Sequence, residues 1–218
     1  MELEKELSDM KIDIATITET KKKLKGSQEL DKYIMIYNGV EQNQRASAGV
    51  AIMINKALKT KIHSYTFVNE RIVLARLRVE RGFITIVAAY APEDGRSRET
   101  DKFYKRLQET IHKINKNDYL ILAGDMNGRV GNMPVKDVLG TNGESTLNEN
   151  GKKLIDFASF NNLKITNSFF KHKEIHKFTW SERGSQTIID YIITNRKTSS
   201  YIQDTRAFRG CDIGSDHF

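Results

Sequence analysis

The chain has 218 residues, and its hydrophobic (39%) and charged (29%) fractions predict one globular domain over residues 1–218 without a membrane-spanning run. The polar, acidic N-terminus excludes a secretory signal peptide, and the lone Cys211 excludes an intrachain disulfide, so we expect an intracellular protein. A net charge of +7 and a pI near 9.3 favour a polyanionic partner, although each basic cluster is more typical of a solvated face.

The first half of the chain is expected to consist mostly of strands. Residues 2–10 have the apolar spacing of an amphipathic helix. Alternating or continuous apolar runs predict strands over residues 12–19, 33–39, 48–55, 60–68, 70–80 and 83–93, with a hairpin turn at Arg81-Gly82.

The second half mixes helices and strands. Phe103, Leu107, Ile111 and Ile114 are spaced for a helix, with Ser97 or Thr100 as its N-cap. We then expect a strand over 119–125, a Gly- and Asn-rich loop over 128–150, a helix over 151–162, and strands over 163–167, 178–181 and 187–195. This α/β (α+β) pattern predicts two mixed sheets packed together with helices outside.

Polar side chains stand where several of these strands end. The stretch LILAGDMNG places Asp125 and Asn127 directly after a buried strand, either as a site or as an ordinary Asx-type turn. Glu19 closes the first strand, and Tyr90 ends another before a proline. Asp190 lies between isoleucines of an apparently buried strand, where a carboxylate needs a partner.

A terminal Ser215-Asp216-His217-Phe218 completes the pattern, although alone it is typical of a surface tail. In chain order the motifs ITET, AAYAPE, GDMNG, IIDYII and SDHF resemble the exonuclease–endonuclease–phosphatase superfamily over nearly the whole chain. The phrases LNENGKKLIDFASFNNLKITNSFF and FTW are most similar to endonucleases of RTE-like non-LTR retrotransposons and to craniofacial development protein 2-like proteins.

The resemblance implies a four-layer α/β/β/α sandwich with its site at one edge of the sheets. It implies metal-assisted phosphodiester hydrolysis with Mg²⁺ or Mn²⁺ as cofactor, because a divalent ion offsets the phosphate charge. DNA is the implied substrate, the nucleus the implied location, and a reverse transcriptase domain the implied neighbour in a longer parent protein.

The resemblance also assigns roles to residues of this sequence. Glu19 is the expected metal ligand, with Asp216 close to the metal. Asp125 orients or deprotonates the attacking water, and Asn127 donates its amide to the phosphoryl oxygens or the nucleophile. His217 contacts the phosphate while Asp190 holds its ring and favours its charged form. Tyr90 reaches the phosphate from the far side.

Weaker assignments concern the residues around this set. Thr179 and Ser215 match polar positions that support the site, and Trp180, the only tryptophan, is equally suited to stacking on a base and to core packing. Asn148 and Asn150 precede a helix and are expected to be caps rather than ligands.

Three functions agree with these observations. An endonuclease that nicks DNA for retrotransposition fits the basic charge and the FTW and NENG phrases. A phosphoesterase of the same fold acting on a lipid or inositol phosphate shares the Asp-x-Asn and Asp-His motifs. A decayed nucleic-acid-binding remnant fits the ends of the chain, where a first strand carrying a metal-binding Asn and a last strand are expected to be missing.

Overall fold

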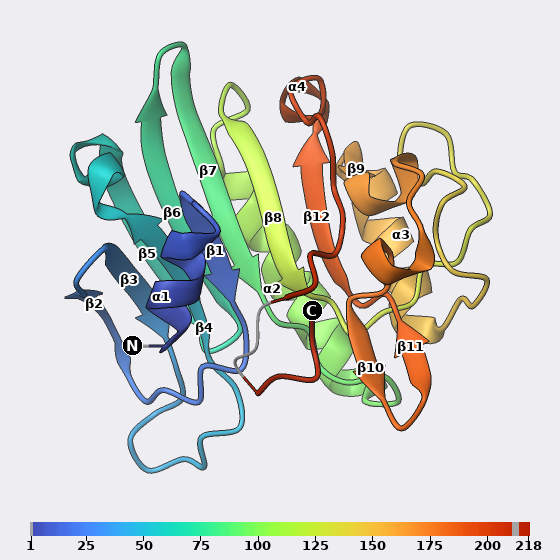
Figure 1. The fold of residues 1–218 in the computed structure, drawn as a ribbon, viewed down its shortest axis with the longest axis horizontal. Coiled ribbons are helices and arrows are strands. Elements are labelled where there is room, and N and C mark those ends of the chain that lie inside the picture. Colours follow the sequence, from blue (N-terminus) through green and yellow to red (C-terminus); the bar gives the residue numbers. More distant parts are fainter. Residues whose placement is uncertain (1, 211–213) are drawn as a thin grey trace. The chain divides into compact units, whose positions relative to one another are not determined.

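The computed structural model describes residues 2–210 and 214–218, so Cys211 lies outside the described part (Figure 1). The described chain divides into two compact units. Unit 1 runs to Tyr90 and includes Thr110–Gly124, and unit 2 comprises Ala91–Glu109 and Asp125–Phe218. The single domain expected from the sequence stays a prediction.

The secondary structure is a mixture of helices and strands, as predicted. The helices are α1 (Glu2–Asp9), α2 (Ser97–Lys113), α3 (Glu149–Phe160) and α4 (Arg196–Ser199), with short 3-10 helices η1 (Lys56–Lys61), η2 (Thr166–Phe169) and η3 (Glu174–His176). The strands are β1 (Ile14–Ile17), β2 (Lys25–Glu29), β3 (Tyr33–Asn38), β4 (Val50–Asn55), β5 (Ile62–Asn69), β6 (Ile72–Val79), β7 (Gly82–Ala89), β8 (Tyr119–Asp125), β9 (Leu163–Ile165), β10 (Trp180–Glu182), β11 (Ser185–Thr187) and β12 (Asp190–Asn195). Among the described residues, no helix has both the length and the apolar character needed to cross a membrane.

Unit 1 contains strands of both main sheets packed face to face. One sheet has the order β1-β4-β3-β2, and in the other β5, β6 and β7 pair antiparallel while β8 pairs parallel to β7. Alternating residues such as Ile36 and Ile52 from the first sheet share a core with Val73 and Ala75 from the second. On the other face of the first sheet, Leu3 and Leu7 of α1 pack against a second cluster, as the helical spacing predicted.

The prediction of two sheets is confirmed. The first sheet is not mixed, because β1–β4, β4–β3 and β3–β2 all pair antiparallel. Strand β2 escaped prediction because its sequence, KGSQE, is polar and almost wholly exposed. It exists because β3 offers it an edge to pair with along five residues. The four-layer arrangement stays a prediction.

Unit 2 is built on α3, most of α2, and the antiparallel pair β12–β9. Its second feature is the hairpin β10–β11, whose two-residue turn Arg183-Gly184 has positive φ at both positions (48° and 84°). That backbone geometry matches the tight turns that suit the twist of paired strands.

Two expected elements differ in the structure. The stretch TIIDYIITN is not one strand, because Thr187 belongs to β11 and β12 begins only at Asp190. The ladder is interrupted because the N–H groups of Ile189 and Asp190 both donate to the Thr179 hydroxyl (3.1 Å each). Asp190 therefore opens a strand, with its side chain 29% exposed, rather than lying inside a buried one. Helix α2 begins at Ser97, so both Ser97 and Thr100 lie within its first turn and neither precedes the helix as its cap.

Candidate functional site

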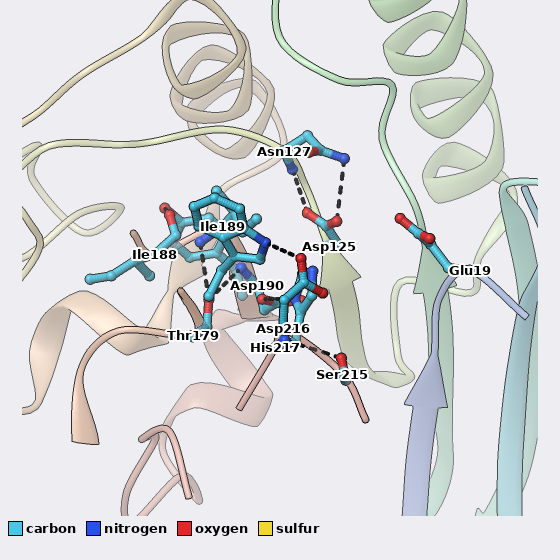
Figure 2. A network of polar contacts seen from close by, with 12 residues as sticks. Glu19, Asp125, Asn127, Thr179, Ile188, Ile189, Asp190, Ser215, Asp216 and His217 are labelled. Atoms are coloured by element: carbon cyan, nitrogen blue, oxygen red, sulfur yellow. Dashed lines mark hydrogen bonds and ion pairs between the residues drawn. The ribbon is translucent and has the colours of Figure 1, made fainter. Parts of the chain in front are cut away.

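Asp125 is the last residue of β8 and belongs to unit 2. It is buried, with 2% of its surface exposed. Its Oδ1 accepts the backbone N–H of Asn127 (2.8 Å), and its Oδ2 accepts the Asn127 side-chain amide (3.3 Å). The same amide donates to Ala91 O (2.9 Å). The Asx-type turn is therefore present, and it fixes Asp125 while engaging the Asn127 amide inside the protein (Figure 2), whereas the catalytic role of the two residues stays a prediction.

A glycine is required immediately before this carboxylate. Gly124 has φ +141°, and a Cβ there would lie 2.1 Å from Ala89 O, a backbone atom of the neighbouring strand. Neither the dihedral angle nor the space suits another residue. The glycine of GDMNG is therefore explained by the close packing of Gly124 against the neighbouring strand, and the following aspartate by the chemistry expected of Asp125.

Asp190 and His217 form a hydrogen-bonded pair. His217 Nδ1 lies 2.9 Å from Asp190 Oδ2, and both side chains are partly buried (Figure 2). Thr179 sets the position of Asp190, since its buried hydroxyl accepts the N–H groups at the start of β12. The pairing expected from the resemblance is present, although roles in catalysis stay predictions.

The terminal tail is tied to β10 through its backbone. Ser181 N–H donates to Asp216 O (3.0 Å), Phe218 N–H donates to Thr179 O (2.8 Å), and Trp180 and His217 form an antiparallel bridge. The Ser215 hydroxyl accepts the His217 N–H (3.1 Å). These contacts hold His217 in register and explain why SDHF is not a free surface tail.

Trp180 contacts a candidate metal ligand. It is half-buried, and its indole N–H donates to Asp216 Oδ2 (2.7 Å). Neither stacking on a base nor core packing accounts for this bond. The contact shows the indole N–H orienting the Asp216 carboxylate.

Charges around His217 favour its protonated form. Burial by itself lowers the pKa of the imidazole, but the hydrogen bond and charge of Asp190 outweigh burial, and the charges of Asp125 and Asp216 act in the same direction. Together they raise the pKa of His217 to about 9. At neutral pH the ring is therefore a cation suited to contact a phosphate.

Unit 1 holds a second group of predicted site residues. Glu19 follows β1 with φ 51°, and its Oε1 accepts the Tyr90 hydroxyl (2.8 Å), while Lys21 Nζ lies 3.8 Å from Oε2. Tyr90 was expected to reach the substrate phosphate, but its hydroxyl here is bonded to Glu19. The observed contact thus connects Tyr90 to a candidate metal ligand.

Arg71 belongs to this group and was missed from the sequence. Its guanidinium lies over the Tyr90 ring, 5.0 Å from the centroid, and donates to Tyr90 O (3.2 Å). The one available signal was a cation at the start of the apolar run RIVLARL. Many such cations are only strand ends, so the pattern could not distinguish it.

Asn150 is a second residue whose contacts the sequence did not indicate. The Asn148 side chain caps α3 by accepting the Gly151 N–H (2.8 Å), as predicted. Asn150 is instead buried inside the first turn, and its amide donates to Pro92 O and to Asn127 O (2.9 Å each). It therefore braces the loop that carries Asn127.

The long loop over 128–150 is also anchored by charge. Arg129 forms a salt bridge with the buried Glu144, whose other oxygen accepts the Ile188 N–H (2.9 Å). The Tyr191 hydroxyl reaches Gly128 O (2.8 Å) and Ile188 O (2.6 Å). The loop is thereby fastened to the residues preceding Asp190.

The donor atoms present suit a hard divalent cation. Asp125, Asp190 and His217 each offer a ligand atom, and these atoms lie within 4.8 Å of one another, so the three could hold a metal ion. A protonated His217 is a poor ligand because both ring nitrogens then carry hydrogen. The exposed carboxylate of Asp216 lies in the same unit and offers oxygen donors of the kind that Mg²⁺ or Mn²⁺ prefers, whereas Glu19 of unit 1 stays a predicted ligand.

Comparison with known proteins finds matches among both sequences and families. The family model described as endonuclease-reverse transcriptase matches residues 84–218. Craniofacial development protein 2 is 31% identical over 99% of this chain in both Bos taurus and Tragulus javanicus. This chain spans only 36% and 38% of those two proteins, about a third of their length. Exodeoxyribonuclease III of Haemophilus influenzae is 30% identical over 42% of this chain and 38% of its own length.

Solved structures share the fold at low sequence identity. The endonuclease domain of TRAS1, a telomere-specific non-LTR retrotransposon, matches with a TM-score of 0.69 and 17% identity, over 99% of this chain and 87% of that domain. The 3′ phosphatase NExo from Neisseria, bound to a product DNA hairpin, matches with a TM-score of 0.66 and 15% identity, over 99% of this chain and 90% of that one.

Proposed function

Because this chain belongs to the endonuclease-reverse transcriptase family of the exonuclease–endonuclease–phosphatase superfamily, we propose that it is a Mg²⁺-dependent phosphodiester hydrolase that nicks DNA. The observation that carries the proposal is the buried Asp125 of GDMNG in the same unit as the Asp190–His217 pair. A carboxylate can serve as a general base and a charged imidazole can stabilise negative charge on a phosphate, and both effects promote hydrolysis of a phosphodiester.

The residues of unit 2 take complementary roles in this proposal. Asp125 accepts a proton from the attacking water, and Asn127 holds that carboxylate in place through two hydrogen bonds. His217 binds a phosphoryl oxygen as a cation, with Asp190 fixing its ring. Thr179 and Ser215 are positioning residues, since they hold the backbone of Asp190 and His217.

Glu19 and Asp216 are the proposed ligands of the metal. Tyr90 orients the Glu19 carboxylate and Trp180 orients that of Asp216, each by donating one hydrogen bond. When bound, the ion would neutralise the charge of the phosphodiester and of the departing alkoxide.

DNA is the proposed substrate. The net charge of +7 and the DNA hairpin bound by the NExo relative support it. The family description, endonuclease-reverse transcriptase, supports a further proposal that the chain serves retrotransposition beside a reverse transcriptase domain. We propose the nucleus as the place where it acts.

The test is nicking of supercoiled plasmid by the purified chain in Mg²⁺, with EDTA as the metal control. Asp125→Asn is expected to lower the nicking rate about 10²–10⁴-fold. The matched control is Asp156→Asn, which removes an exposed carboxylate on α3 and should leave the rate unchanged. Glu19→Gln should move the Mg²⁺ dependence to higher concentration.

Equal nicking by the wild type and Asp125→Asn would contradict the assigned chemistry. Absence of nicking by a folded wild type that still binds DNA would favour a binding remnant. Hydrolysis of inositol phosphates without nicking would favour the phosphoesterase alternative.

A further inference from the structure

A basic pocket of about 470 Å³ lies in unit 2, away from the Asp190–His217 pair. Its lining comprises Val135, Lys136, Asp137, Val138, Ser159, Asn162, Lys164, Arg196 and Ser199. Asp190 is the first residue of β12, and Arg196 directly follows Asn195, the last residue of that strand. At about 3.3 Å per strand residue, the two ends of β12 are separated by roughly 17 Å. The pocket is therefore distinct from the candidate catalytic residues.

Three cations converge on this pocket from separate segments. Lys136 comes from the loop after β8, Lys164 from β9, and Arg196 from the start of α4, which follows β12 beside β9 (Figure 1). Asp137 is the only acidic residue of the lining.

The cations of the pocket lack the acidic partners that many other cations of this chain have. Arg129 pairs with Glu144 and Lys153 with Asp101, whereas Lys136, Lys164 and Arg196 form no ion pair within residues 2–210 and 214–218. Lys164 Nζ is held 3.9 Å from the centroid of the Phe169 ring, which positions its charge without neutralising it. Such an uncompensated cluster favours an anion.

Neutral groups complete the chemistry of the pocket. Ser159 and Asn162 can donate hydrogen bonds, whereas the Ser199 hydroxyl already donates to Arg196 O (2.9 Å), and Val135 and Val138 contribute apolar wall. A volume of this size falls within the range of small-ligand sites. Arg and Lys together with hydroxyl donors are the groups that recognise phosphate oxygens.

We propose that this pocket binds a phosphate group, carried either by a small free anion or by the backbone of bound DNA. The binding is independent of the hydrolytic function proposed above, because it uses none of the residues assigned to that reaction.

The first arm of the test is calorimetric titration of the full chain with pyrophosphate in EDTA. The double variant with Lys164→Gln and Arg196→Gln should bind at least tenfold more weakly than the wild type. Lys136→Gln alone should weaken binding by a smaller factor. The matched control Lys105→Gln, an exposed cation on α2 outside the pocket, should bind as the wild type does. Equal binding by the wild type and the double variant, or no binding by either, would overturn the proposal.

The second arm identifies the carrier of the phosphate. Binding of a short DNA duplex in EDTA is measured for the same variants, whose unaltered melting temperatures would exclude loss of folding. If the double variant loses duplex affinity and pyrophosphate competes with the duplex, the DNA backbone occupies the pocket. If only pyrophosphate binding falls, the ligand is a small anion. Nicking by the double variant in Mg²⁺ separates this proposal from the hydrolytic one, since loss of the pocket should leave the chemical step intact.

Discussion

At the scale of single residues, hydrogen-bond partners decide what the candidate groups can do. Asp125 has its amide partner two residues along the chain, whereas Asp190 finds His217 across 27 positions of sequence. The local pair could be predicted from the spacing in GDMNG. The distant pair was expected from motif order alone, and the tail that carries His217 acquires its position only through β10.

The pKa of His217 is directly measurable. We expect a value near 9 by NMR titration of the imidazole in EDTA, and a return towards 6.5 in Asp190→Asn, because that variant loses the negative charge that opposes burial and keeps only a neutral acceptor. Asp156→Asn is the matched control and should leave the value unchanged.

The same shift affects stability with a defined sign. Since the folded pKa is raised above the ordinary value of 6.5, the pair contributes its full stabilisation below about pH 6.5 and loses it as the pH rises through about 9. Urea unfolding at pH 6 and pH 10 should therefore show a larger effect of Asp190→Asn at pH 6. A His217 pKa below 7 in the wild type would contradict the assigned ion pair.

At the scale of elements, period and breaker residues predicted most of the strands and helices. The alternation in ERIVLARLRVE corresponds to β6, whereas the hairpin turn lies at Glu80-Arg81, one residue before the predicted Arg81-Gly82, because Gly82 already pairs with Val79. Sequence patterns failed to predict strand boundaries that depend on contacts with another segment of the chain. Strand β2 forms on the edge of β3 despite its polar sequence, and Thr179 interrupts the apolar run before Asp190.

The packing of β7 against β8 gives a prediction at this scale. Gly124→Ala should destabilise the fold by more than about 2 kcal/mol, because its Cβ would meet Ala89 O at 2.1 Å in addition to adopting a positive φ. Gly82→Ala is the matched control, since Gly82 has φ +113° but nothing within 4 Å of its Cβ position. It should lose only about 1–2 kcal/mol from the dihedral angle. Chemical denaturation measures both, and equal losses would show that the close approach is unimportant.

At the scale of the whole chain, net charge governs encounter with a polyanion. The excess of +7 predicts that DNA affinity falls with salt, because phosphate contacts release counterions. Between 50 and 200 mM salt we expect a loss of at least about tenfold, as two or more phosphate contacts would produce. Fluorescence anisotropy with a labelled duplex in EDTA measures it. Asp125→Asn should give the same salt dependence as the wild type, and a salt-independent affinity would exclude backbone recognition.

The sequence by itself determined the class of elements, the identity of the candidate acids and the superfamily resemblance, because these depend on local periodicity and on motif order. Tertiary structure alone decided which groups meet. The Tyr90 hydroxyl engages Glu19, the Trp180 indole engages Asp216, and Asn150 braces the Asn127 loop. The basic pocket likewise depends on three segments of unit 2 converging. Contacts between residues distant in sequence arise from strand pairing and packing, which no local pattern encodes.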